Sequence, residues 1–190
     1  MMDEPFAQTT VKARHDCRMR ERWGRGVRLQ SVTSDMHETF QKHVESLPVA
    51  LGKLLAMSPL TCSTLTGDMP GRGVYVFSEA QASLYVGRSN RMRERVRNHG
   101  SKCATYQQAA FAFKLAREAT GHPKATYTST GSRRELMLDP QFVAAFSAAK
   151  IRIGAMQVRF VEEVDPVRQC LLEIYVATSL GTRYNDFDNH

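Results

Sequence analysis

The spacing of apolar residues changes along the chain, and each change predicts a different kind of element. Residues 34–47 have helical spacing, because the capping residues Ser34 and Asp35 come first and one apolar face follows. That face carries Met36, Phe40, Val44 and Leu47. Pro48 is predicted to open a second short helix, since proline fits the first helical turn. The apolar residues of this second helix are Leu51, Leu54 and Leu55.

A second pattern begins after residues 58–72, which are rich in Pro, Gly, Ser and Thr and are predicted to form a linker. Residues 73–78 (GVYVFS) and 83–87 (SLYVG) consist largely of β-branched and aromatic residues, which favours strands. Their close spacing predicts a hairpin, although the turn EAQA lacks the Asn-Gly pair that is typical of hairpins. A third strand is predicted over 156–164, where apolar and polar residues alternate.

Helices are predicted between and after these strands. Asn90 is expected to cap a helix over 91–99, and another helix fits residues 104–119. The pairs Asp139-Pro140 and Asp165-Pro166 each place a capping residue before a proline that suits the first helical position. The last helix therefore starts at Pro166 and runs to about residue 180, where a glycine ends it.

Length and composition exclude several classes of protein. The chain has 190 residues, enough for one ordinary domain with an appendage. It contains no run of about 18 apolar residues, so no membrane span or membrane partner is expected. The four cysteines stand far apart without a CxxC pair, which argues against a structural zinc site and a secreted disulfide scaffold. A cytoplasmic location is the expectation.

The net charge of +7 is unevenly distributed. Residues 11–28 hold seven basic residues against two acidic ones, and residues 88–97 hold five arginines against one glutamate. Clustered arginine attracts phosphate through its charge and its forked donors, so nucleic acid is one candidate partner. A solvated tail and a solvated helix face explain the same clusters equally well. Residues 1–33 show little apolar periodicity, so a weakly ordered basic arm is expected there.

Three local features are candidates for chemistry. Tyr75 and Tyr85 lie on paired strands next to glycines, and a phenol can donate, accept or take up a proton. Arg91, Arg95 and His99 are spaced four residues apart, so that they share one face of a helix. That face is either exposed to water or binds an anion. The third feature is a carboxylate between apolar neighbours, in CLLEIYVAT at residues 170–178. Such a carboxylate needs a partner, which would be either an arginine or a metal ion.

These features follow the order found in a known family. The chain resembles the GIY-YIG nucleases over about residues 71–188, on six ordered elements. They are Gly73-Val74-Tyr75, Tyr85-Val86-Gly87, Arg95, His99, Glu173 and Asn185. The tripeptides read GVY and YVG instead of GIY and YIG, which are conservative replacements within strands.

The resemblance implies an α+β fold, in which helices flank a small three-stranded antiparallel sheet. It also implies a metal-dependent DNA endonuclease, compatible with restriction, phage defence or repair. Glu173 would hold one Mg²⁺ or Mn²⁺, Tyr75 would be the general base, and Arg95 would stabilise charge on the phosphorus. Tyr85 would orient the attacking group, and His99 would help in positioning or proton transfer. Arg88 and Arg91 would contact phosphates, and Asn185 would fix the C-terminal segment. Gly73 and Gly87 complete the two tripeptides. Because one site cuts one strand, a double-strand cut would need a homodimer or two nicks.

The resemblance divides the chain and leaves alternatives open. A basic arm (1–33) and a helical extension with its linker (34–70) precede the nuclease-like part (71–190), whose helix and loop at about 101–138 are an insertion. The insertion contains the polar loop 121–134, in which Lys124, Arg133 and Arg134 are either a phosphate clamp or simply exposed. The main alternative is a catalytically inactive nucleic-acid-binding module with the same fold. In a third interpretation, residues 36–57 are a docking surface of an interaction protein.

Overall fold

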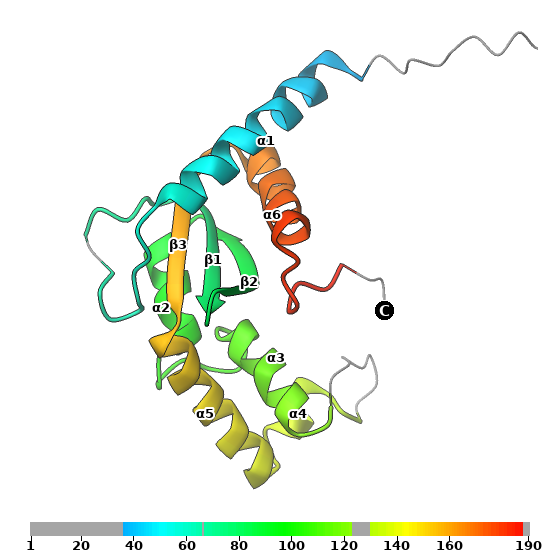
Figure 1. Cartoon of the computed structure of the whole chain (residues 1–190). Coiled ribbons are helices and arrows are strands. Elements are labelled where there is room, and N and C mark those ends of the chain that lie inside the picture. Colours follow the sequence, from blue (N-terminus) through cyan, green and yellow to red (C-terminus); the bar gives the residue numbers. More distant parts are fainter. Residues whose placement is uncertain (1–35, 66, 123–129, 188–190) are drawn as a thin grey trace, which may run out of the picture. The chain divides into compact units, whose positions relative to one another are not determined.

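The computed structural model describes residues 36–65, 67–122 and 130–187, where a three-stranded antiparallel sheet is packed between helices (Figure 1). The strands are β1 (Gly73–Glu79), β2 (Ala82–Ser89) and β3 (Gln157–Glu162). Their order is β2-β1-β3, so β1 is central and pairs with both neighbours. The predicted α+β class with a small antiparallel sheet is confirmed. The predicted arm, residues 1–33, and the capping pair at 34–35 lie outside the described residues.

The hairpin between β1 and β2 forms without the expected turn sequence. Ala80 and Gln81 are the two loop residues, and both have positive φ angles, of 48° and 69°. Two-residue hairpin loops need this conformation because its twist matches that of the strands. Neither residue favours it, since a side chain at positive φ crowds the backbone. The pairing of the two strands therefore imposes this turn conformation. For that reason the turn residues themselves do not predict it.

Six helices occupy the described part of the chain. They are α1 (Glu38–Ala56), α2 (Met92–Gly100), α3 (Ala110–Ala119), α4 (Arg133–Leu136), α5 (Pro140–Ala155) and α6 (Pro166–Leu180). The side chains of Asp139 and Asp165 cap α5 and α6 as predicted, by accepting hydrogen bonds from backbone N–H groups of the first turn. In the part of the chain that the structure covers, no helix is long and apolar enough to cross a membrane.

Three details of the helix prediction were wrong. Pro48 does not open a second helix but lies inside α1, on its exposed side. Residues 104–109 form turns, so α3 begins only at Ala110. Asn90 is not the cap of α2: Arg91 occupies that position, while the Asn90 side chain accepts a hydrogen bond from Gln169 at 3.1 Å.

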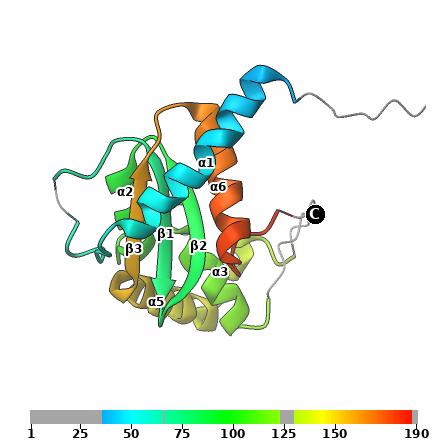
Figure 2. The ribbon, with the colours of Figure 1, turned by 45° about the horizontal axis from the view of Figure 1, so that its top comes forward.

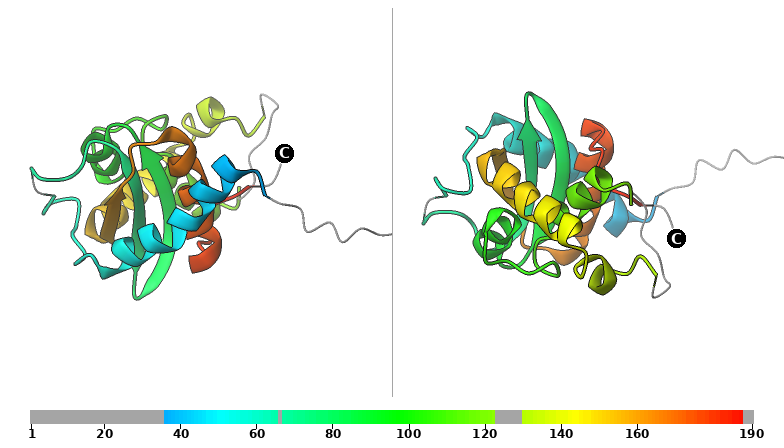
Figure 3. Two further views of the ribbon diagram at one scale, coloured as in Figure 1. Left: turned by 90° about the horizontal axis from the view of Figure 1, so that it is seen from above. Right: turned by 90° about the horizontal axis from the view of Figure 1, so that it is seen from below.

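The alternation of side chains along β1 separates two apolar clusters. Val74 and Val76 belong to the cluster on one face of the sheet, with Leu47 of α1 and Leu172 of α6. Tyr75 and Phe77 belong to the larger cluster on the other face, to which α2, α3 and α5 contribute. Figures 2 and 3 show the same division, with α1 and α6 on one side of the strands and α3 and α5 on the other. A central strand covered on both faces is buried throughout, as β1 is up to Ser78.

Both edges of the sheet are covered by other segments of the chain. Leu60, in the predicted linker, exchanges two backbone hydrogen bonds with Val158 of β3, at 2.9 and 2.7 Å. At the opposite edge, the Tyr184 N–H donates to the carbonyl of Leu84 at 3.0 Å. Asn185 follows it and pairs with Val86 of β2 through both its amide oxygen and its amide nitrogen. The unpaired backbone groups that an edge strand would present to another chain are therefore partly satisfied within the molecule.

Candidate functional site

The centre of the candidate site is a hydrogen bond between Tyr75 of β1 and His99 of α2. The phenolic oxygen of Tyr75 lies 2.8 Å from Nε2 of His99, and both side chains are fully buried. Burial and the charge of Arg95 lower the pKa of His99 to about 3, so the imidazole is neutral at physiological pH. Its other nitrogen, Nδ1, is buried and has no hydrogen-bond partner within the described residues. An unpaired buried nitrogen of this kind is uncommon and is a feature of functional sites.

The two glycines of the tripeptides make room for this arrangement. Tyr75 and Gly87 are opposite one another in the β1–β2 ladder, and the phenol lies over the glycine. A Cβ atom at Gly87 would come within 2.5 Å of Cζ of Tyr75. Gly73, with φ of 155°, leaves no space for a Cβ either, because that atom would meet the carbonyl oxygen of Val161. Close approach, and not turn geometry, thus explains why glycine occupies both positions.

Arg95 connects the two tyrosines to the inserted segment. Its guanidinium lies close enough to the phenols of Tyr75 and Tyr85 to influence the pKa of both, and Nη1 donates to the carbonyl oxygen of Gln108 at 3.0 Å. Burial opposes the charge of Arg95, but the tyrosine oxygens stabilise it, and its pKa is raised. Burial also raises the pKa of both phenols, against the lowering effect of Arg95, so both are protonated at neutral pH.

Phe111 and the Gln108 carbonyl are parts of this cluster that sequence reasoning missed as site residues. The Phe111 ring, on α3, is stacked on Tyr85 with 4.7 Å between ring centroids and 9° between ring planes. The predicted helix over 104–119 includes Phe111, but its position in a helix did not indicate what the ring would contact. A backbone carbonyl has no sequence signature, so the Arg95–Gln108 contact could not be found without the structure.

Glu173 reaches the site from α6, on the other side of β2. Its Oε2 accepts a hydrogen bond from Nε of Arg88 at 2.9 Å. Burial raises the pKa of the Glu173 carboxyl despite the opposing effects of Arg88 and Arg95. In turn, the Glu173 charge is one of the smaller influences that raise the pKa of Tyr75 and Tyr85. Arg88 is therefore a partner of the Glu173 carboxylate.

The remaining predicted residues lie at the edges of the cluster. Arg91 precedes the first turn of α2 and is exposed, forming an ion pair with Glu94 at 3.3 Å. It therefore does not continue the stripe of Arg95 and His99. Asn185 contacts the backbone of β2 on both sides of Val86, as described above, and accepts a further hydrogen bond from Thr182 at 3.0 Å. Its contacts hold the C-terminal segment against the strand that carries Tyr85 and Gly87.

The donor set suits a hard divalent cation bound by few protein ligands. Within the described residues there is no cluster of three or more His, Cys, Asp and Glu side chains that could hold a metal ion. Glu173 is a single carboxylate whose side chain is 24% exposed, and the charge of Arg88 compensates it. Mg²⁺ is often bound by one or two carboxylates, with waters and substrate phosphate oxygens completing its shell. The residues present fit that kind of site, provided that Arg88 gives way.

Comparison of the chain with protein-family models, curated proteins and solved structures gave no match. The candidate function is therefore derived from the arrangement of the residues themselves. Four side chains from β1, β2 and α2 form one contiguous cluster: Tyr75, Tyr85, Arg95 and His99. Glu173 belongs to a fourth element, α6, and pairs with Arg88 at the end of β2.

Proposed function

We propose that the protein is a metal-dependent endonuclease of the GIY-YIG type, which hydrolyses phosphodiester bonds in DNA. The convergence of Tyr75, Tyr85, Arg95, His99 and Glu173 carries this proposal. These residues are up to 98 positions apart in the sequence and gather around β2, and an arginine, phenols and a carboxylate can serve as charge stabiliser, proton acceptor and metal ligand in phosphate-ester hydrolysis. A purely structural cluster has no need for an arginine, two phenols and a carboxylate at one place.

Tyr75 and His99 are proposed to manage the proton of the attacking water. The phenol oxygen takes up this proton as its own proton moves to Nε2 of His99, along the 2.8 Å hydrogen bond. The water oxygen bonds to phosphorus, and the bond from phosphorus to the leaving oxygen breaks. In the closed cluster burial and Arg95 lower the pKa of His99 to about 3, so the imidazole holds the phenol proton only while the charge of the attacked phosphate stabilises it, and the proton then passes back through the phenol to the leaving oxygen.

Arg95 is proposed to stabilise the negative charge that develops on the phosphoryl oxygens. Its side chain is half-buried, and the Gln108 carbonyl and the two phenols hold the guanidinium in place. A cation that is already oriented acts on developing charge without first reorganising, which is the largest contribution in many enzymes. Tyr85, stacked on Phe111, would orient the attacking group beside it.

Glu173 is proposed to bind Mg²⁺ or Mn²⁺, and Arg88 to contact a substrate phosphate once it leaves the carboxylate. A bound divalent cation would supply positive charge that activates water and stabilises the leaving oxygen. In this exchange Arg88 pairs with a phosphate and Glu173 pairs with the cation, so that each charge keeps a partner of opposite sign. The Arg88 side chain is 44% exposed and can therefore turn toward solvent or a phosphate, while the less exposed Glu173 needs the cation in its place.

A catalytically inactive nucleic-acid-binding module is the second candidate, and one observation favours it. Tyr75 and His99 are fully buried, and Arg88 neutralises Glu173, so the cluster as it stands is closed. For catalysis, Arg95 or Arg88 must shift when substrate arrives. In the inactive alternative these contacts stay in place, and the arginines of α2 bind phosphates without turnover.

Cleavage of supercoiled plasmid by the purified protein distinguishes the two candidates. With Mg²⁺ or Mn²⁺ the wild type is expected to produce nicked or linear DNA, and EDTA should abolish this. Tyr75→Phe removes only the phenolic oxygen and should lower the rate about 10²-fold or more, as loss of a general base does. Tyr106→Phe is the matched control, since Tyr106 belongs to the same apolar cluster without joining the site.

The product pattern also bears on the expected homodimer. Linear product that appears together with nicked product indicates coupled cuts by two sites, whereas linear product that appears only after nicked DNA has accumulated indicates independent nicks. Wild-type protein that binds the plasmid and a branched DNA substrate but cleaves neither in both metals would contradict the nuclease and favour the inactive module.

A further inference from the structure

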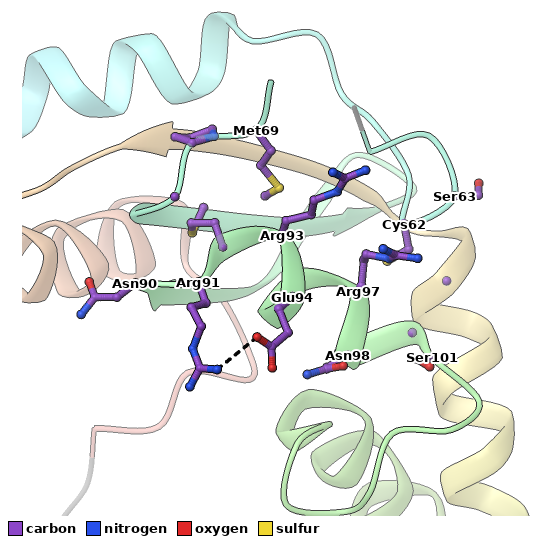
Figure 4. Close-up of a pocket in the computed structure, with 15 residues that line it drawn as sticks. Cys62, Ser63, Met69, Asn90, Arg91, Arg93, Glu94, Arg97, Asn98 and Ser101 are labelled. Atoms are coloured by element: carbon purple, nitrogen blue, oxygen red, sulfur yellow. Dashed lines mark hydrogen bonds and ion pairs between the residues drawn. The ribbon is translucent and has the colours of Figure 1, made fainter. Parts of the chain in front are cut away.

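A pocket of about 1010 Å³ lies beside α2 (Figure 4). Its wall is formed by α2 and by the segment around Cys62 and Ser63, and its end by Gly100 and Gly154. The two glycines allow this close approach of α2 and α5: a Cβ at Gly100 would lie 2.9 Å from Cα of Gly154. Arg93 and Arg97 extend along the pocket from successive turns of α2, as Figure 4 shows.

Arg93 and Arg97 differ from the ion-paired arginines of the described residues. Five arginines form ion pairs with glutamates, namely Arg88, Arg91, Arg152, Arg168 and Arg183. Among the residues that the structure describes, Arg93 and Arg97 have no acidic partner. Two like charges four residues apart on a helix repel each other, so the pair is unfavourable until an anion arrives. Asn98 and Ser101 add uncharged polar groups to the same pocket.

The geometry of α2 relates this pocket to the candidate active site. Residues two apart on a helix differ by about 200° in direction, so Arg93 and Arg97 point away from the side on which Arg95 meets the tyrosines. One short helix thus presents arginines on two opposite flanks. A chain of phosphates that contacts both flanks must cross α2, whose diameter with side chains is about 10–12 Å.

We propose that this pocket binds a backbone phosphate of the nucleic-acid strand that is cut, a few nucleotides from the scissile phosphate. The separation follows from the diameter of α2, which the strand has to cross between the two sites. Arg93 and Arg97 supply forked donors for the phosphate oxygens, and Asn98 and Ser101 line the pocket beside them. The inference rests on the proposed nuclease function, but the phosphate site itself is testable without cleavage.

Fluorescence anisotropy with a labelled 12-nucleotide DNA strand in EDTA measures binding alone. Arg93→Gln/Arg97→Gln is expected to weaken binding about tenfold or more, and to lower the slope of log K against log salt by about 0.7 to 1.4. Arg93→Lys/Arg97→Lys should recover the salt slope but only part of the affinity, because lysine keeps the charge and loses the fork. Lys42→Gln/Lys53→Gln, which also removes two positive charges from one helix, should leave the affinity within about twofold of wild type.

Substrate length and a small phosphate compound separate a strand site from a nucleotide site. Shortening the DNA from twelve to two nucleotides should remove the difference between wild type and Arg93→Gln/Arg97→Gln. If thymidine 5′-monophosphate binds as tightly as the 12-mer and still depends on these arginines, the pocket is a small-molecule site and the strand path is wrong. Equal affinities of wild type and the glutamine variant for the 12-mer would overturn the phosphate site itself.

Failure of this inference is distinguishable from failure of the proposed function. Wild-type protein that cleaves plasmid, combined with unchanged binding in Arg93→Gln/Arg97→Gln, would retain the nuclease and reject the pocket. Protein that does not cleave but whose DNA binding depends on Arg93 and Arg97 would retain the phosphate site in the inactive module.

Discussion

Gly87 is the residue whose identity its neighbours restrict most clearly. It faces Tyr75 across the β1–β2 ladder, and the phenol occupies the space that a side chain would need. The sequence marked this glycine only through its spacing from Tyr85 and Arg95. The physical reason lies across the ladder, in a contact between two strands, and such a contact has no local signature in the sequence.

Gly87→Ala is therefore expected to destabilise the protein by about 1–3 kcal/mol, the usual cost of overpacking. It should also move Tyr75 away from His99 and lower any cleavage activity. Gly52→Ala is the control, because Gly52 lies inside α1 and a Cβ there meets nothing within 4 Å. That substitution should stabilise the protein by about 0.5–1 kcal/mol. Urea unfolding of both variants measures the change in unfolding free energy, which should be negative for Gly87→Ala and positive for Gly52→Ala. A Gly87→Ala protein as stable as wild type would contradict the close contact.

His99 makes stability depend on pH in a defined window. Its pKa is about 3 in the folded protein, because of burial and Arg95, and about 6.5 when unfolded. Between these values the unfolded chain binds a proton that the folded protein does not bind. The stabilising contribution is therefore complete above pH 6.5 and is lost progressively as the pH falls toward 3.

The unfolding free energy is expected to fall by about 2 kcal/mol more in wild type than in His99→Gln between pH 7.5 and 5.0. Glutamine does not titrate and can still accept a hydrogen bond from Tyr75. The carboxylates that titrate in this range are shared by both proteins, so their effects cancel in the difference. Parallel pH curves for the two proteins would show that His99 becomes charged without unfolding, contrary to its burial.

At the scale of elements, α2 and α3 together assemble the candidate site. The helix after the second strand was predicted from a cap and an apolar stripe, and it places Arg95 and His99 toward β1. The site also needs α3, from the predicted insertion, which contributes the ring of Phe111 and lies next to the Gln108 carbonyl. The insertion is thus part of the site, which its position in the sequence did not indicate.

Phe111→Leu tests whether α3 positions Tyr85. Leucine keeps most of the apolar volume, so the loss of stability should stay below about 1.5 kcal/mol. Loss of the stacked ring should nevertheless reduce cleavage at least tenfold, since Tyr85 is no longer held in one orientation. Phe146→Leu is the matched control, because Phe146 packs on Phe113 in the same cluster without contacting Tyr85. If the two variants have similar stabilities and similar activities, α3 does not position Tyr85 for catalysis.

At the scale of the whole molecule, the sequence predicted the three strands better than the segments that pack on the sheet and along its edges. Strong β-branched and aromatic runs located all three strands, and two Asp-Pro caps located α5 and α6. By contrast, the linker was not predicted to pair with β3 through Leu60, nor α1 to continue through Pro48. Both depend on tertiary packing, since the α1 face with Leu47 and Leu54 is buried against the sheet and α6. Tertiary contacts of this kind override local preferences.

The same distinction holds for the candidate site. Residue types and order predicted that these side chains would share one site, and the structure brings Tyr75, Tyr85, Arg95 and His99 together. The pairing of Arg88 with Glu173 was only one of two possibilities, because an isolated sequence does not indicate which charge lies opposite a carboxylate. The pocket along Arg93 and Arg97 was not predicted, since it depends on how closely α5 approaches α2.

The most direct test of the central claim compares two glutamate substitutions in a metal-dependent cleavage assay. Glu173→Gln removes the carboxylate that pairs with Arg88, and Glu79→Gln removes one that pairs with Arg152 in a similarly exposed ion pair. Wild type and Glu79→Gln are expected to cleave supercoiled plasmid at equal rates in Mg²⁺, whereas Glu173→Gln should bind the plasmid and leave it intact. Cleavage by Glu173→Gln at the wild-type rate would contradict the proposed metal-dependent nuclease.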